Sequence, residues 1–187
     1  MNALLNLDQA LFLAINGWHS TFFDYIMYFV SGKISWLPLY IFLIYLLFHN
    51  YGKKAWLILL LVAITILLSD TGSVLLFKNT VCRLRPSHEP ALAGLVHIVN
   101  GYTGGEYGFV SSHASNFFAL SLLLIQFLGK QYKWITLSLL LWAALIGYSR
   151  VYLGVHYPGD VICGALYGAI IGYTVARIGK QKLHIVP

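Results

Sequence analysis

Residues 55–77 read AWLILLLVAITILLSDTGSVLLF, and this stretch decides the class of the protein. Its one ionisable side chain is Asp70. As a helix the stretch is about 35 Å long at 1.5 Å per residue, which exceeds the roughly 30 Å hydrocarbon core of a bilayer. The whole chain is 59% hydrophobic and 10% charged, whereas soluble domains are about 25% charged. The sequence therefore predicts one integral-membrane domain over residues 1–187.

Further apolar segments lie on both sides of this stretch. They cover residues 35–49, 113–129, 134–149 and 158–177, so that five spans are predicted within a transmembrane core of residues 35–177. Several are shorter than the usual ~20 residues, and we expect these to extend into their flanks or to cross a locally thin bilayer. The predicted fold is all-α, a polytopic bundle of membrane helices.

The last of these spans carries a glycine at every fourth position, namely Gly164, Gly168 and Gly172. Glycines with this spacing share one helix face, and they let a neighbouring helix approach closely. We expect the stripe to serve helix packing.

The first part of the chain, residues 1–31, is apolar but does not read as a span. Residues 3–16 place leucines at helical spacing opposite polar residues such as Asp8, which predicts a short amphipathic helix in the membrane interface. Residues 22–30 form a second apolar run, and a helix of eleven or so residues there reaches only about 17 Å. We interpret the region as interfacial, and whether residues 20–34 complete a sixth span is left open.

Basic residues predict the orientation of the bundle. With these spans, two short connections and the C-terminal tail fall on one side of the membrane and contain no Asp or Glu. Their basic residues are Lys53, Lys54, Lys130, Lys133, Arg177, Lys180 and Lys182. The positive-inside rule makes this side cytoplasmic. The net charge of +6 therefore reflects basic loops at the membrane, and we expect no nucleic-acid partner.

The opposite side receives the connections 78–112 and 150–157. They contain the remaining cations except Lys33, and these are Lys78, Arg83, Arg85 and Arg150. Basic residues on the side that the orientation rule disfavours are best explained by the binding of an anion.

Three polar clusters in these outer connections suggest what that anion is. The first contains Lys78 and Arg85, the second is the turn SSH at residues 111–113, and the third is SRVYLGVHYPGD at residues 149–160. Guanidinium forks and an ammonium group neutralise a phosphate dianion, and a helix N-terminus offers it free N–H groups. The combination is typical of phosphate chemistry.

The same clusters contain the groups for nucleophilic catalysis. Ser111 or Ser112 is a candidate N-cap, and His113 then falls in the first turn of that helix. His156 and Asp160 are four residues apart, close enough for the carboxylate to hold the imidazole in one tautomer. A neutral imidazole so held is a competent nucleophile, and a second histidine can protonate a leaving alkoxide. The spacing of these residues is not that of a metal site.

These motifs make the sequence similar to the type-2 phosphatidic acid phosphatase superfamily, which shares its site with the vanadium haloperoxidases. Lys78, Arg85 and Pro86 meet the first part of its signature, Ser111 and His113 meet the second in part, and Ser149, Arg150, His156 and Asp160 meet the third in full. Val110 and Ser112 stand where the family has Pro and Gly. Ser112 can supply its backbone N–H as Gly does, provided that the turn does not require a positive φ.

The resemblance implies a membrane helical bundle and a metal-independent phosphomonoesterase that acts through a phosphohistidine and needs no cofactor. By this likeness His156 attacks phosphorus, Asp160 orients His156, and His113 protonates the leaving oxygen. The implied phosphate-binding residues are Lys78, Arg85, Arg150, Ser111 and Ser112.

The leading hypothesis is a multi-pass lipid phosphate phosphatase of the bacterial inner membrane with its active site facing the periplasm. Its partners are then the bilayer and a phospholipid or lipid-linked phosphate, and the candidates are lipid A, undecaprenyl diphosphate and phosphatidylglycerol phosphate. Two alternatives stay open: a phosphotransferase that uses the same phosphohistidine, and a non-catalytic anion transporter. The loop 87–108 is where we expect the substrate to be selected. The sequence makes no prediction of the oligomeric state.

Other charged residues in the outer connections are given a simpler interpretation. Arg83 lies two residues before Arg85 and is expected to contact a headgroup or to be solvated. His88, Glu89, His97 and Glu106 are expected to be solvated loop residues.

Overall fold

The computed structural model describes residues 2–185, and apart from one isolated β-bridge their regular secondary structure is helical. The α-helices are α1 (Asn2–Asn16), α2 (Thr21–Ser31), α3 (Leu37–Tyr51), α4 (Ala55–Gly72), α5 (Asn79–Val81), α6 (Ser112–Leu128), α7 (Lys133–Tyr152) and α8 (Pro158–Lys182). A π-helical turn, η3 (Ser73–Lys78), joins α4 to α5. The 3₁₀ turns are η1 (Ile34–Trp36), η2 (Gly52–Lys54), η4 (Pro86–His88), η5 (Pro90–Leu92) and η6 (Val99–Gly101). The prediction of an all-α fold is confirmed.

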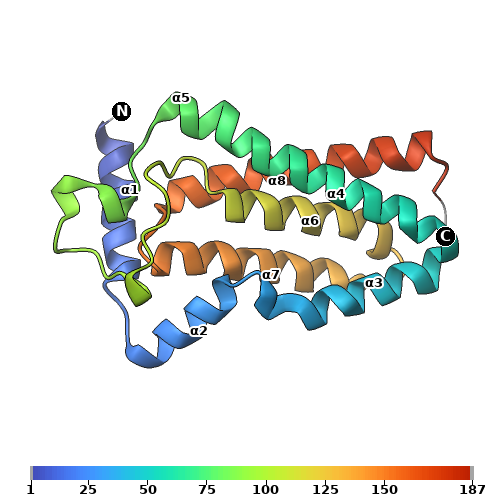
Figure 1. The fold of residues 1–187 in the computed structure, drawn as a ribbon, viewed down its shortest axis with the longest axis horizontal. Helices are drawn as coiled ribbons and strands as arrows, with labels where there is room; N and C mark the ends of the chain where they lie inside the picture. The colour runs from blue at the N-terminus through green and yellow to red at the C-terminus, as the bar shows by residue number, and fades with distance from the viewer. Residues whose placement is uncertain (1, 186–187) are drawn as a thin grey trace.

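The long helices α3, α4, α6, α7 and α8 form a bundle, and α1 lies across one end of it (Figure 1). Within residues 2–185, three helical stretches are long and apolar enough to cross a membrane: Ile34–Val81, Lys133–Tyr152 and Pro158–Lys182. The first of these turns back at Gly52, whose φ of 51° is accessible to glycine, so that it comprises both α3 and α4. Helix α6 is apolar but shorter.

Two residues that were predicted in the connections lie on helices instead. Lys78 belongs to η3, because the helical path of α4 continues to Val81. Arg150 lies in the last turn of α7, which extends to Tyr152. Both cations are therefore held by regular backbone.

Helix α6 occupies the centre of the bundle, and α8 packs closely against it. A Cβ atom added at Gly168 would lie 1.9 Å from the carbonyl oxygen of Ser115, and one added at Gly172 would lie 2.0 Å from that of Ala119. On the α4 side, the hydroxyl groups of Ser69 and Ser115 are hydrogen-bonded at 2.6 Å in a buried position. The glycine stripe is thus the surface through which α8 contacts α6, as the sequence predicts.

We expect Gly168→Ala to destabilise the bundle, because the new methyl group has no space beside the α6 backbone. Overpacking of this kind costs about 1–3 kcal/mol, which corresponds to a Tm lower by several degrees. Thermal unfolding in detergent measures the shift. Gly105→Ala is the matched control, since a Cβ atom there meets nothing within 4 Å. Equal Tm values for the two variants would contradict this account of the α6–α8 contact.

The two ends of the bundle differ in composition. The α3–α4 turn, the α6–α7 turn and the C-terminal residues lie together at one end (Figure 1). There Lys54 Nζ donates a hydrogen bond to the carbonyl oxygen of His184 at 3.3 Å, and the Tyr51 hydroxyl donates one to that of Phe127 at 2.7 Å. We call this the basic end, because the seven cations predicted to be cytoplasmic are on these segments.

The opposite end, which we call the site end, carries α1, the loop between α5 and α6 and the connection between α7 and α8 (Figure 1). Asn16 fastens the loop to α1: its side chain donates to the carbonyl oxygen of His97 at 2.9 Å and accepts from the His97 N–H at 2.8 Å. The His97 imidazole also pairs with Asp24 of α2 at 3.0 Å. The expectation that His97 is a solvated loop residue was therefore wrong.

Candidate active site

Backbone hydrogen bonds bring the three sequence clusters together at the site end. The segments 83–85 and 106–108 run antiparallel. The Arg85 N–H donates to the backbone carbonyl oxygen of Glu106 at 3.0 Å, and the Gly108 N–H donates to that of Arg83 at 2.8 Å. The N–H of Ser111 donates to the carbonyl oxygen of Asp160 at 3.0 Å. The first cluster is thus paired with the loop before the second, and the second is joined to the third.

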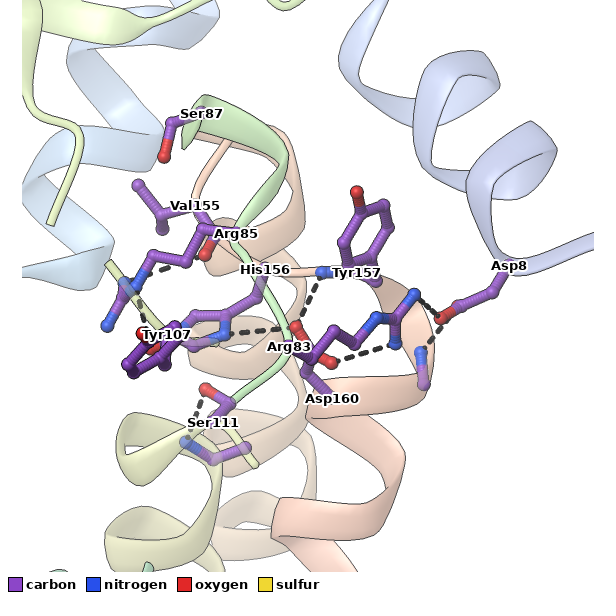
Figure 2. Close-up of polar contacts among 12 residues, drawn as sticks. Asp8, Arg83, Arg85, Ser87, Tyr107, Ser111, Val155, His156, Tyr157 and Asp160 are labelled. Atoms are coloured by element: carbon purple, nitrogen blue, oxygen red, sulfur yellow. Dashed lines mark hydrogen bonds and ion pairs between the residues drawn. The ribbon is translucent and has the colours of Figure 1, made fainter. Parts of the chain in front are cut away.

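The third cluster places His156 against Asp160. Helix α8 begins at Pro158, so that Asp160 lies in its first turn, where a carboxylate is favoured by the helix dipole. Asp160 Oδ2 accepts a hydrogen bond from the Tyr157 N–H at 3.1 Å and lies 3.4 Å from Nδ1 of His156 (Figure 2). His156 is 1% exposed and Asp160 is 0% exposed. Because Nδ1 faces a carboxylate, we assign the proton to Nδ1, which leaves the lone pair on Nε2.

Three cations act on the His156 ring. Burial lowers the pKa of His156 well below its usual value of 6.5, and the charges of Arg85, Arg150 and Lys78 lower it further. The imidazole is therefore neutral at physiological pH, as a nucleophile must be.

Arg85 is held on the side of His156 away from Asp160 (Figure 2). Its Nε donates to the carbonyl oxygen of Tyr107 at 3.2 Å and its Nη1 to that of Val155 at 3.5 Å. The side chain is only 7% exposed. A Cβ atom added at Gly104 would lie 2.4 Å from Nη1 of Arg85. A side chain at position 104 would therefore clash with the guanidinium of Arg85 in this position.

Arg150 is buried and partly unpaired. Its Nη1 donates to the Ser31 hydroxyl and its Nη2 to the Tyr102 hydroxyl, the latter at 3.2 Å. Its Nε is buried and has no hydrogen-bond partner within residues 2–185. A buried donor without a partner is costly, and a phosphoryl oxygen would satisfy it.

A cavity of about 200 Å³ adjoins Arg150. His113, in the first turn of α6, lines it together with Arg150, Tyr102 and Lys33. Lys33 and Tyr102 were not among the predicted site residues, because neither belongs to a recognisable motif. Lys33 directly precedes η1, and Tyr102 lies in the loop after η6. The cavity thus joins a histidine and two cations from separate parts of the chain.

Ser111 and Ser112 form the turn that leads to His113. Ser111 is the N-cap of α6 and accepts a hydrogen bond from the Ala114 N–H at 3.4 Å. The Ser112 hydroxyl is hydrogen-bonded to that of Ser73 at 2.6 Å. Ser112 is not among the residues with positive φ, so this turn does not require the glycine found there in the family pattern.

Arg83 and Asp8 form a connection behind Asp160 that sequence reasoning missed. Arg83 Nη1 lies 3.0 Å from Asp160 Oδ1, and its Nη2 lies 2.8 Å from Asp8 Oδ2 (Figure 2). The expectation that Arg83 contacts a headgroup or is solvated was therefore wrong. Asp8 stood out in the sequence only as a polar residue of an amphipathic segment.

A metal centre is not evident in the part of the chain that is described. Among residues 2–185, no three His, Cys, Asp or Glu side chains come together in a way that could hold a metal ion.

Comparison with known proteins places this arrangement in a family. The sequence profile of the PAP2 superfamily matches residues 54–183. A lipid A 4'-phosphatase of Bacteroides thetaiotaomicron is 41% identical over 165 residues, which are 87% of this chain and 72% of that protein. The chain belongs to the PAP2 superfamily. The match includes the signature residues from Lys78 to Asp160, whereas Asp8 and Lys33 lie outside it.

Other PAP2 relatives agree in sequence and in fold. A lipid A 4'-phosphatase of Porphyromonas gingivalis is 37% identical over 88% of this chain and 69% of its own length. The crystal structure of a transmembrane PAP2-type phosphatidylglycerolphosphate phosphatase from Bacillus subtilis has a TM-score of 0.71 at 25% identity, covering 97% of this chain and 88% of that one. The crystal structure of Aquifex aeolicus LpxE has a TM-score of 0.66 at 26% identity, covering 91% and 95%.

These findings fix the class of the protein. It is an integral membrane protein with several helical spans, and it is a lipid phosphate phosphatase.

Proposed function

We propose that the chain removes a phosphate group from lipid A at the periplasmic face of the bacterial inner membrane, through a phosphohistidine on His156. The observation that carries the reaction is the buried pair of His156 and Asp160 beside three cations. The choice of lipid A is supported by the names of the relatives at 41% and 37% identity.

In the first step His156 Nε2 attacks phosphorus. The Nε2–P bond forms, and the bond from phosphorus to the ester oxygen of the sugar breaks. Asp160 accepts the Nδ1–H hydrogen bond throughout, which fixes the tautomer and stabilises the positive charge that develops on the ring. His113 gives a proton to the leaving oxygen, so that an alcohol departs and not an alkoxide.

The phosphoryl oxygens need cationic partners during this step. Arg85, Arg150 and Lys78 supply charge, and the Ser111 and Ser112 turn supplies donors at the N-terminus of α6. Arg150 contributes the buried Nε that lacks a partner within residues 2–185. In the second step water attacks phosphorus, the Nε2–P bond breaks, and inorganic phosphate is released while His113 takes up a proton.

The substrate is distinguished by a panel of lipids. Purified protein in detergent, with EDTA present, is expected to release phosphate from lipid A faster than from phosphatidylglycerol phosphate or undecaprenyl diphosphate, and vanadate is expected to inhibit the release. No release from any of these lipids would reject the hydrolase. Lipid A turnover without inorganic phosphate, but with phosphorylated acceptor alcohol, would identify a transferase.

The proposed topology has five spans, α3, α4 with η3, α6, α7 and α8, with α1 and α2 in the interface at the site end. The cations at the basic end make that end cytoplasmic. Cys82 is exposed and Cys163 is partly exposed, so both are first replaced by serine. In that background Lys53→Cys is expected to react with a membrane-impermeant maleimide only after the inner leaflet is exposed. A cysteine at Glu106 of the site-end loop is the counterpart and is expected to react in intact spheroplasts. The reverse pattern would invert the topology.

The pH dependence of kcat/KM tests the protonation state of His156. Since the pKa of His156 is depressed, the free imidazole is already neutral at pH 6.5. We therefore expect the acid limb of kcat/KM, corrected for ionisation of the phosphate ester, to lie below pH 6.5. Arg85→Met removes one of the charges that depress this pKa, so its acid limb is expected at higher pH than in the parent. A parent limb at or above pH 6.5 would argue against a buried neutral nucleophile.

A further inference from the structure

Both oxygens of the Asp160 carboxylate have partners. Oδ2 faces Nδ1 of His156 and accepts a hydrogen bond from the Tyr157 N–H, and Oδ1 accepts one from Arg83 Nη1 at 3.0 Å. The side chain of Asp160 is 0% exposed, so water does not replace a protein donor at Oδ1. Without Arg83 the buried carboxylate would lose the cationic partner of Oδ1, and within residues 2–185 only its contacts at Oδ2 would still hold it.

Arg83 is itself fixed by two further groups. Its guanidinium lies 3.9 Å from the centroid of the Tyr157 ring, and its Nη2 lies 2.8 Å from Asp8 Oδ2. The two terminal nitrogens of Arg83 thus pair with the carboxylates of Asp160 and Asp8. Neither nitrogen is directed at the cavity beside His113. Figure 2 shows Arg83 and Arg85 on opposite sides of the His156–Asp160 pair. Two arginines only two residues apart therefore have different tasks.

Asp8 connects this arginine to the start of α8. Its Oδ1 accepts from the Gly159 N–H at 2.7 Å while its Oδ2 pairs with Arg83. A Cβ atom added at Gly159 would lie 2.8 Å from Asp8 Oδ2, so the contact requires a glycine at this position. Asp8 is on α1, which crosses the end of the bundle (Figure 1).

We propose that Arg83, anchored by Asp8 of α1, is a positioning residue that holds Asp160 in the orientation in which it fixes His156. Arg83 does not touch the phosphate; it acts through Asp160. The proposal rests on the proposed function, in which Asp160 orients the nucleophile.

The central experiment is a double-mutant cycle on phosphate release from lipid A in detergent micelles. Arg83→Met keeps the aliphatic stem against Tyr157 and removes the fork. It is expected to lower kcat about 10- to 100-fold, as loss of a group that orients a reacting residue does, with KM within about twofold of the parent. In an Asp160→Asn background, where no carboxylate is left to hold, the same change is expected to cost less than about threefold.

Two further variants keep the test decisive if Arg83→Met does not fold. Arg83→Lys retains a charge but not the fork that reaches both carboxylates, so its kcat is expected between those of the parent and Arg83→Met. Asp8→Asn leaves Arg83 bound to Asp160 and is expected to lower kcat less than Arg83→Met does. Added guanidinium is expected to restore part of the kcat of Arg83→Ala. Arg177→Met, an exposed arginine at the basic end, is the control and should match the parent.

The outcomes separate this proposal from the one on which it rests. A parental kcat in Arg83→Met, or in both Arg83→Lys and Asp8→Asn, would overturn the positioning role. An equal loss from Arg83→Met in the parent and in the Asp160→Asn background would also overturn it, because the effect would then not pass through Asp160. If Asp160→Asn alone had full activity, the proposed function of the His156–Asp160 pair would fail first.

Discussion

His156→Ala is expected to lower kcat for phosphate release from lipid A by at least about 10⁴-fold, the scale of loss when a covalent nucleophile is removed. The reason is geometric. His156 Nδ1 faces Asp160 at 3.4 Å, and its ring has the charges of Arg85, Arg150 and Lys78 around it. Alanine leaves the cations in place, so the substrate still binds, but no atom remains to form the bond to phosphorus.

The phosphoenzyme gives a second measurement of the same prediction. After acid-free quenching, parent protein incubated with labelled lipid phosphate is expected to carry acid-labile label, as a phosphorus–nitrogen bond does, and His156→Ala is expected to carry none. His49→Ala is the control, because His49 is an exposed residue at the far end of α3. Label that persists in His156→Ala would move the nucleophile to another residue.

The sequence predicted the helices well, because apolar runs of this length leave few alternatives to a membrane helix. The predicted segments 113–129 and 158–177 correspond to α6 (Ser112–Leu128) and to most of α8 (Pro158–Lys182). Proline and the serine cap mark where these helices start, since both residues have local physical reasons to be there. Helix ends without such a signal were less well placed, as the extension of α7 to Tyr152 shows.

The candidate site was predictable where a motif has a fixed spacing. The pair His156 and Asp160 is four residues apart on a turn that leads into α8, so that their contact follows from local geometry. The contacts of Arg83 could not be predicted, because they do not follow from local spacing. Its partners are Asp8 and Asp160, 75 and 77 residues away in the sequence, and only the tertiary fold decides which of two neighbouring arginines pairs with these carboxylates.

His113→Ala is the second prediction with a large effect, and its size is expected to depend on the leaving group. With lipid A, whose sugar alkoxide is a poor leaving group, loss of the general acid is expected to lower kcat about 10²- to 10⁴-fold. His113 lines the cavity of about 200 Å³ beside Arg150, and in the proposed mechanism the ester oxygen lies next to it. An aryl phosphate with a strongly acidic phenol needs no proton on its leaving oxygen, and for it the loss is expected to be less than about tenfold.

A series of aryl phosphates therefore distinguishes an acid from a binding residue. If His113 donates the proton, the logarithm of kcat/KM should fall more steeply with the pKa of the phenol in His113→Ala than in the parent. His113→Gln, which keeps a hydrogen-bond donor but cannot transfer a proton, should have the same steep slope. Parallel lines for the three proteins would mean that His113 contributes equally to every substrate, and the general-acid role would be lost. The steep slope combined with an intact phosphohistidine would place His113 on the leaving-group side of phosphorus, opposite His156, as in-line displacement requires.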